Sequence, residues 1–308
     1  MVAACRPPGR LAAAEVMRVK AFAPAKVNLY LHVTGRRADG YHLLDSLVAF
    51  ADVGDHIVAE EATDFSLEVS GPEAGALTAA GEDNLVLRAA RLLAAHTGIS
   101  TGAALHLEKR LRVAAGIGGG SSDAAATMRA LRDLWQIAVD DATLRALAAE
   151  LGADVPACIS GCAVWVGGIG ERIELAVALP KAGILFANPR RNLPTAAVFA
   201  ARRGGFGQPG RFGQMPSDAA GLGQILMRRR NDLTDAAIGL VPEIATVLAR
   251  LATLPGALLA RMSGSGATCF ALFGDCYEAE SAGKILLAAE PLWWCAAGSL
   301  VAAQKLSG

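Results

Sequence analysis

Residues 113–126 read Val-Ala-Ala-Gly-Ile-Gly-Gly-Gly-Ser-Ser-Asp-Ala-Ala-Ala, with four glycines within five positions. Residues 103–111, just before this stretch, have the character of a β-strand. After it, Ala124, Met128, Leu131 and Trp135 recur at helical spacing with charged residues between them. The pattern predicts a strand, a glycine-rich loop and a helix N-terminus, in that order.

Such a loop is suited to binding phosphate. The first turn of a helix leaves backbone N–H groups unpaired and carries partial positive charge. Glycines lack a Cβ, so the backbone can wrap closely around an anion. Ser121 or Ser122 can cap the helix and also donate a hydroxyl to a phosphate. The simpler alternative is a glycine-rich turn with a serine cap.

The best-known phosphate loops do not fit the sequence. The Gly283-Lys284 pair is followed by Ile285, which excludes a Walker A loop. Three positions after Gly118 stands Ser121, where a dinucleotide fingerprint has glycine. The His-Arg-Asp and Asp-Phe-Gly tripeptides of protein kinases are absent from the sequence.

Composition indicates a folded protein with two domains. The chain has 308 residues, 53% hydrophobic and 19% charged, with 29 basic and 29 acidic side chains. This balance provides no global basic field, so we expect no nucleic-acid partner. Residues 1–17 lack the apolar core of a signal peptide, and no apolar run is long enough for a membrane span. We expect a cytoplasmic protein with a flexible tail at 1–17, no membrane partner and reduced cysteines.

Polar side chains with catalytic potential occur along the first half of the chain. Residues 22–33 alternate, which predicts a strand with Lys26, Asn28, Tyr30 and His32 on one face. A solvated face is the alternative. Further strands are expected at 43–50, 55–60 and 65–70, after an Asp39-Gly40 turn that is followed by Tyr41-His42.

Three more residues have an ordinary structural interpretation beside a functional one. Asp83 or Asn84 is suited to cap a helix that ends near His96. Lys109 ends the strand before the glycine loop, where it either meets nucleotide or is solvated. Asp154, between Gly152 and Pro156, is either a common helix-start residue or a functional carboxylate.

The second half has a different pattern. Strands near 162–167, 171–175 and 182–187 predict a crossing between domains. A helix opens at Pro194 and contains Thr195 and Phe199. Residues 202–216 are rich in Arg, Gly, Gln and Pro, which predicts a mobile loop, with weak RNA binding as an alternative. Helices and strands alternate from 218 to 303 and predict a ferredoxin-like layer.

The glycine loop resembles the phosphate loop of the galactokinase, homoserine kinase, mevalonate kinase and phosphomevalonate kinase (GHMP) superfamily. Five separated phrases match in the family's order, between about residues 21 and 303. Besides the loop they are Pro-Ala-Lys-Val-Asn-Leu at 24–29, Gly-Arg-Arg-Ala-Asp-Gly-Tyr-His at 35–42, Gly-Ala-Asp-Val-Pro at 152–156, and Arg-Met-Ser-Gly-Ser-Gly-Ala-Thr at 261–268. A segment at 194–199 resembles a substrate segment of one subfamily. Arg112 departs from the family, which often has proline there.

The resemblance implies an α+β fold of two domains. Residues 18–165 would form a ribosomal-protein-like α/β domain that binds ATP, and residues 166–308 a ferredoxin-like domain carrying the mobile loop 202–216. The 261–268 turn would pack near the phosphate loop while also joining two strands.

The resemblance also implies a reaction and its residues. ATP, with Mg²⁺, would phosphorylate an alcohol of a small-molecule substrate, a cytidine diphosphate derivative. Lys26 would contact the reacting hydroxyl and Asp154 would be the base. The residues that would bind ATP are Asn84, Lys109, Ala114, Ala115, Gly116, Ile117, Gly118, Gly119, Gly120, Ser121 and Ser122. Those that would bind the other substrate are Asn28, Tyr41, His42, Thr195 and Phe199.

Two alternatives stay open. Another GHMP small-molecule kinase, of the homoserine or mevalonate type, would not need Tyr41-His42 or the 195–199 segment. An RNA-binding module is the alternative outside enzymes, although balanced charge argues against it. The sequence leaves the Mg²⁺ ligands and the choice between monomer and homodimer undetermined.

Overall fold

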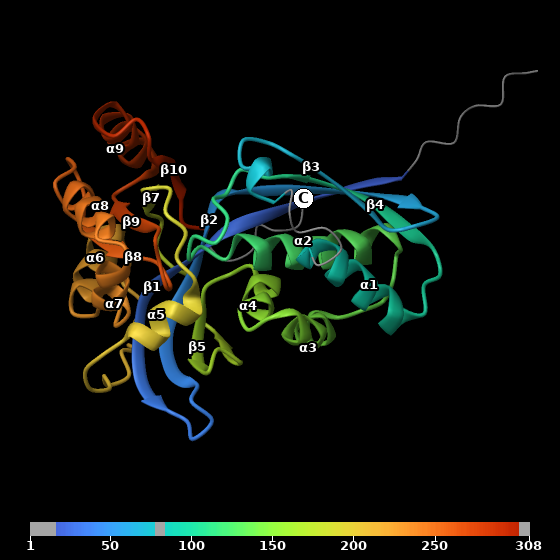
Figure 1. Cartoon of the computed structure of the whole chain (residues 1–308), viewed down its shortest axis with the longest axis horizontal. Helices are drawn as coiled ribbons and strands as arrows, with labels where there is room; N and C mark the ends of the chain where they lie inside the picture. The colour runs from blue at the N-terminus through green and yellow to red at the C-terminus, as the bar shows by residue number, and fades with distance from the viewer. Residues whose placement is uncertain (1–16, 78–83, 302–308) are drawn as a thin grey trace, which may run out of the picture.

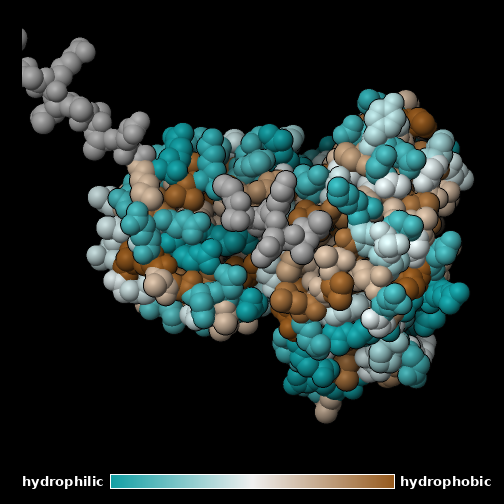
Figure 2. Space-filling model, turned by 180° about the vertical axis from the view of Figure 1, so that it is seen from behind, coloured by the Kyte–Doolittle hydropathy of each residue, from teal (hydrophilic) through white to brown (hydrophobic). Residues whose placement is uncertain are grey.

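The computed structural model describes residues 17–77 and 84–301. They form two sheets, each covered by helices, and Figure 1 shows the sheets side by side with their helices around them. Seen from behind, the surface has two lobes, and hydrophobic side chains gather where the lobes meet (Figure 2). Residues 1–16, which make up most of the predicted tail, lie outside the described residues.

The first sheet is built on a long antiparallel pair, β1 (Arg18–Arg36) and β2 (His42–Ala62). At one end β2 also pairs with β4 (Gly102–Glu108), and at the other with β5 (Val164–Gly168). The edges are β3 (Ser66–Ser70), parallel to β4, and β6 (Arg172–Leu175), antiparallel to β5. The predicted strands at 43–50 and 55–60 are therefore one strand.

Helices cover one face of this sheet (Figure 1). They are α1 (Leu85–Thr97), α2 (Gly119–Leu134), α3 (Asp141–Leu151) and α4 (Val155–Ser160), with a short 3₁₀ turn at Ala74–Ala76. Helix α2 lies against β1 and has buried Ala124, Ala125 and Ala126. Because alanine side chains are small, the glycine loop at the start of α2 is held close to the strand that carries Lys26.

The second sheet has the strand order β10-β7-β9-β8 and is antiparallel. Its strands are β7 (Gly183–Asn188), β8 (Leu259–Met262), β9 (Cys269–Phe273) and β10 (Trp294–Ser299). Its helices are α5 (Thr195–Ala201), α6 (Ala219–Met227), α7 (Thr234–Leu240), α8 (Glu243–Ala252) and α9 (Cys276–Ala289). This order of strands and helices confirms the ferredoxin-like layer and the α+β class.

The chain crosses between the sheets after β6. A boundary at residue 165 would cut β5, which pairs with β2 in the first sheet. The pairing therefore places the crossing between Leu175 and Gly183. The sequence does not reveal this, because the sheet that a short strand joins depends on partner strands distant in the chain.

A β-bulge interrupts the alternation of β1. Asn28 pairs with Val48 and Tyr30 with Leu47, so Leu29 has no partner in β2. One extra residue reverses the faces beyond it. Lys26, Asn28 and Leu31 line the main cavity, whereas Tyr30 and His32 point to the opposite side. The prediction that all four polar residues share one face was wrong for Tyr30 and His32.

Segment 202–216 has no helix beyond the end of α5 and no strand, but it is docked on the protein. The ring of Phe212 lies edge-on to Trp165 with centroids 5.1 Å apart. The Gly210 amide donates to Asp45 Oδ2 at 2.6 Å. Phe212 thus packs against the core between the sheets although the segment is polar in composition. The predicted mobility of the segment stays a prediction.

Within the described ranges, 17–77 and 84–301, no helix is long and apolar enough to cross a membrane.

Candidate active site

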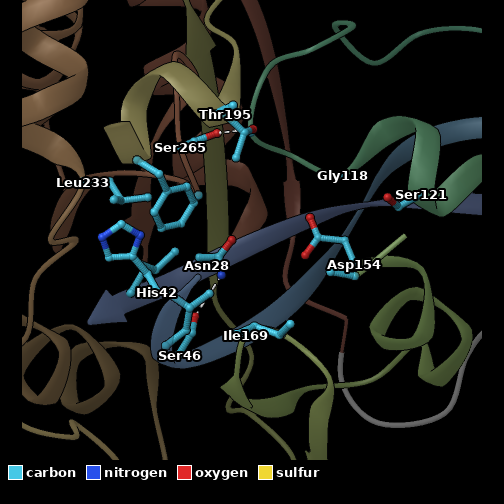
Figure 3. A pocket seen from close by; sticks show the side chains of 18 of the residues that line it. Asn28, His42, Ser46, Gly118, Ser121, Asp154, Ile169, Thr195, Leu233 and Ser265 are labelled. Atoms are coloured by element: carbon cyan, nitrogen blue, oxygen red, sulfur yellow. Dashed lines mark hydrogen bonds between the residues drawn. The ribbon is translucent and has the colours of Figure 1, made fainter. Parts of the chain in front are cut away.

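A cavity of about 1060 Å³ lies between the first sheet with its helices and the second sheet with its helices. The hairpin of β1 and β2, the glycine loop, the start of α4, and α5 all contribute to its walls, as Figure 3 shows for the labelled residues. The predicted site residues that line it are Lys26, Asn28, Tyr41, His42, Ala114, Ala115, Gly116, Gly118, Gly119, Gly120, Ser121, Asp154, Thr195 and Phe199.

Lys26 and Asp154 meet in this cavity. The Lys26 Nζ lies 3.1 Å from Asp154 Oδ2 and 3.1 Å from Asn28 Oδ1. The Lys26 side chain is 5% exposed, while that of Asp154 is 55% exposed. A buried ammonium thus faces a carboxylate that solvent or substrate can reach. This pairing suits withdrawal of a proton from an alcohol beside a fixed positive charge.

The glycine loop is the third side of the same cavity. Helix α2 begins at Gly119, and Gly118 precedes it with a φ of 63°, in the left-handed region. A Cβ on Gly116 would lie 2.6 Å from the Ser263 carbonyl, so only glycine fits there. The Lys26 amide donates to the Ile117 carbonyl at 2.9 Å, which ties the loop to β1.

The two serines of the loop differ. Neither caps α2, because Gly118 occupies the capping position and both serines lie within the first turn. Ser121 lines the cavity. The Ser122 hydroxyl is buried and donates to the Pro24 carbonyl at 2.7 Å, and its amide donates to the Gly118 carbonyl. Ser122 therefore lies beneath the loop, and we remove it from the residues expected to touch phosphate.

Lys109 is also beneath the loop. Its Nζ lies 2.6 Å from Asp55 Oδ2 and 2.6 Å from Asp123 Oδ2, and its side chain is 1% exposed. Burial alone would lower the pKa of Lys109, but the attraction of Asp123 and Asp55 raises it. Burial raises the pKa of Asp123, the positive charge of Lys109 opposes this, and Asp55 adds to the rise. Lys109 thus supports the loop instead of meeting nucleotide or water.

Two further predicted residues, Asn84 and Ile117, are not among those that line the cavity. The Asn84 side chain caps α1 by accepting from the Val86 amide at 2.9 Å, which decides between the two predicted caps, and Asp83 lies outside the described residues. Leu85, next to it, lines the cavity. Ile117 is fully buried in the hydrophobic core between the sheets. Contact of Asn84 or Ile117 with ATP stays a prediction.

The far end of the cavity carries aromatic side chains. The rings of His42 and Phe199 stack with centroids 5.2 Å apart and planes 27° apart. Tyr41 beside them is 61% exposed. Burial, and then the positive charges of Arg36 and Arg202, lower the pKa of His42. A neutral imidazole with one donor and one acceptor is thus available here.

Several cavity residues escaped the sequence analysis. Ser265 lies 2.8 Å from the Thr195 hydroxyl, and Ser46 accepts from Asn28 Nδ2 at 2.9 Å, as the dashed lines in Figure 3 show. Ser263 donates to the Gly116 carbonyl at 3.0 Å, which confirms that the 261–268 turn packs on the glycine loop. Both Ser263 and Ser265 lie in the quoted 261–268 phrase, so glycine spacing could have drawn attention to them. Ser46 has no such signal.

Comparison with known proteins agrees with this geometry. The model of the GHMP kinases N terminal domain matches residues 84–162, and that of the GHMP kinases C terminal domain matches residues 215–289. A solved homoserine kinase from Cytophaga hutchinsonii has a TM-score of 0.72, covering 97% of this chain and 98% of its own. Its identity of 17% shows a shared fold. The chain belongs to the GHMP kinases.

More similar proteins narrow the family. The 4-diphosphocytidyl-2-C-methyl-D-erythritol kinase of Rhodospirillum rubrum is 53% identical, covering 90% of this chain and 91% of its own. The 4-diphosphocytidyl-2-C-methyl-D-erythritol kinase of Cereibacter sphaeroides is 51% identical, covering 92% of this chain and 99% of its own. A crystal structure of 4-(cytidine 5'-diphospho)-2C-methyl-D-erythritol kinase is 37% identical with a TM-score of 0.74, covering 91% and 98%. Within the GHMP kinases, the chain belongs to the 4-diphosphocytidyl-2-C-methyl-D-erythritol kinase family.

Proposed function

We propose that the protein transfers the γ-phosphate of ATP to the 2-hydroxyl of 4-diphosphocytidyl-2-C-methyl-D-erythritol. The products are the 2-phosphate and ADP, in the non-mevalonate route to isoprenoid precursors. The observation that carries the proposal is the 3.1 Å contact of Lys26 with Asp154 beside the glycine loop, within one cavity.

Asp154 accepts the proton of the attacking hydroxyl in this proposal. Its exposed carboxylate lies at the start of α4, so the substrate hydroxyl can reach it while Asp154 keeps its position. Lys26 stabilises the negative charge that develops on that oxygen, because its ammonium is already desolvated and held. Phosphoryl transfer depends mainly on such positioning and charge neutralisation.

The phosphates of ATP bind at the glycine loop. Backbone N–H groups at the start of α2 and the Ser121 hydroxyl supply donors. No cluster of three or more His, Cys, Asp or Glu side chains suited to a metal is found in the described part of the chain. Mg²⁺ that arrives with ATP needs only one or two protein oxygens, and the Ser121 hydroxyl, which lines the cavity, would supply one. When bound, it neutralises phosphate charge.

The cytidine diphosphate end binds at the aromatic end of the cavity. We assign the base to the neighbourhood of Tyr41, His42 and Phe199, where an aromatic face and a neutral imidazole lie together. Thr195 lies closer to the glycine loop through its contact with Ser265, so its hydroxyl is placed for the diphosphate. Asn28 holds the substrate beside Lys26.

Phosphorus NMR of the purified protein with ATP, Mg²⁺ and the diphosphocytidyl substrate tests the proposal. A new phosphomonoester signal that grows with ADP is the expected result, and its absence with intact substrate rejects the proposal. Thermal shifts with CDP, homoserine and mevalonate separate this kinase from its relatives, since a ligand stabilises the fold it binds. Of these three ligands, only CDP is expected to raise the melting temperature.

A further inference from the structure

We propose that Ser46, through the side-chain amide of Asn28, positions Lys26 for phosphoryl transfer. The inference rests on the proposed function and adds a residue to it that no motif indicates. Ser46 lies on β2, is 1% exposed and lines the cavity behind Asn28 (Figure 3).

The β-bulge in β1 creates the need for this serine. Two carbonyl groups near the bulge take side-chain donors: that of Leu29 accepts from Arg261 Nη1 at 2.6 Å, and that of Tyr30 accepts from Ser46 Oγ at 2.5 Å. A hydroxyl has one proton to donate. Ser46 uses it on the Tyr30 carbonyl, so its oxygen can only accept from any other neighbour.

That constraint fixes the orientation of Asn28. The group that lies 2.9 Å from Ser46 Oγ must be a donor, which makes it the Nδ2 amide nitrogen. The amide oxygen Oδ1 then faces the opposite way and lies 3.1 Å from Lys26 Nζ. An ammonium only donates. Each hydrogen bond in the series is therefore donated in the same direction, from Lys26 through Asn28 and Ser46 to the Tyr30 carbonyl.

Loss of the Ser46 hydroxyl would disturb the catalytic pair. Without it, the Asn28 Nδ2 group has no acceptor in this series, and only the contact of Oδ1 with the Lys26 ammonium still orients the amide. A buried donor would be left unpaired, so the amide would shift toward another acceptor and Lys26 would move from the place where it meets Asp154. Small displacements of this kind lower turnover strongly, because positioning supplies much of the rate. The backbone amide of Asn28 is held separately by Ser263 at 3.2 Å.

The test is a double-mutant cycle on steady-state kinetics with the diphosphocytidyl substrate. We expect Ser46→Ala to lower kcat about tenfold, the loss of about one hydrogen bond, with KM for ATP unchanged. In an Asn28→Ala background the same change should lower kcat less than roughly twofold, because the residue through which it acts is gone. A purely structural role at the bulge predicts equal losses in both backgrounds, and that result overturns the proposal.

Conservative variants guard against a protein that does not fold. Ser46→Thr keeps the hydroxyl and suits a strand, so it should restore kcat, and Ser46→Cys, a weak donor, should be intermediate. If Ser46→Ala does not fold, the Cys variant takes its place in the cycle, and wild-type kcat for it overturns the proposal. Thr97→Ala is the matched control, because it removes a hydroxyl bonded to the Leu93 carbonyl away from the cavity. Turnover by the wild type tests the proposed function separately.

Discussion

At the scale of single residues, the site is defined by one cation, one carboxylate and one aromatic end. Lys26 and Asp154 come from segments more than a hundred residues apart. Their contact depends on α2, which packs against both β1 and α4. Their roles lead to different kinetic consequences for different substitutions.

Replacing Asp154 with Asn should remove the proton acceptor while preserving its shape. We expect kcat to fall by about 10²–10⁴, the usual contribution of a general base. Stopped-time assays of ADP release measure the loss. Asp218→Asn, which changes the cap of α6 away from the cavity, serves as the control. Turnover close to that of the wild type would exclude Asp154 as the base.

Replacing Phe199 with Ala should weaken binding of the cytidine substrate alone. Stacking of a base on an aromatic ring contributes about 1–3 kcal/mol, so KM for that substrate should rise about tenfold or more. KM for ATP should not change. Phe206→Ala, an exposed ring that does not line the cavity, is the control. An equal rise in both KM values would contradict the assignment of the base to this ring.

Binding of CDP should respond to pH through His42. Burial and the charges of Arg36 and Arg202 lower its pKa below the ordinary value of 6.5. The neutral ring therefore persists to lower pH, and affinity should stay constant from neutral pH down to about 6.5 and decline only in more acidic buffer. Calorimetry across this range tests the direction. A decline that begins above 6.5, and survives in His42→Gln, would assign the effect to another group.

At the scale of elements, the glycine loop rests on a buried ionic support. Lys109, which directly follows β4, joins Asp55 of β2 to Asp123 near the start of α2. Asp55 also accepts from the amides of Arg110 and Leu111. The Lys109 ammonium stabilises the two carboxylates, which would be unfavourable in this buried position without a positive charge. The ion pairs hold the N-terminal part of α2, and with it the glycine loop, in position against β2.

Replacing Lys109 with Met should therefore destabilise the whole protein. Removal of one partner from a buried ion pair leaves an uncompensated charge, which costs about 3–5 kcal/mol of the free energy of unfolding. Urea titration measures the change. Lys181→Met removes an exposed lysine and should stay within about 0.5 kcal/mol of the wild type. A loss of that smaller size for Lys109→Met would mean that the cluster is not held by charge.

Elements with strong local signals were predictable from the sequence. The glycine loop and the strand with Lys26 each depend on a few adjacent residues, and the alternation of helices and strands from 218 to 303 indicated the ferredoxin-like layer. The bulge at Leu29 was not predictable, because it comes from pairing with β2 and leaves no mark in the alternation. The same holds for Ser46 and for the burial of Lys109, which depend on strands distant in sequence.

At the scale of the whole molecule, β1 connects all the hydrophobic clusters. Ala23 belongs to the core under α1 and α2, Val27 to the core between the sheets, and Val33 to the core of the second sheet. One strand thus shares its burial among three packed regions. The two sheets are expected to lose their structure together.

Unfolding should therefore be a single transition. Trp135 packs against the first cluster and Trp294 lies in the second, so tryptophan fluorescence reports on both. In urea, its midpoint should coincide with that of far-ultraviolet circular dichroism. Single Trp→Phe variants at each position assign the signal. Two separated midpoints would show that the sheets unfold independently.

The bond between the Val301 amide and the Phe50 carbonyl, at 2.8 Å, has a consequence for synthesis. The isolated bridge from Ala51 to Leu300 lies beside it. A ribosome makes Phe50 long before Val301. The backbone of β2 near Phe50 therefore lacks this hydrogen-bond partner until synthesis is almost complete. This part of the strand edge therefore stays unpaired for most of translation, and unpaired edges of this kind can pair with other chains.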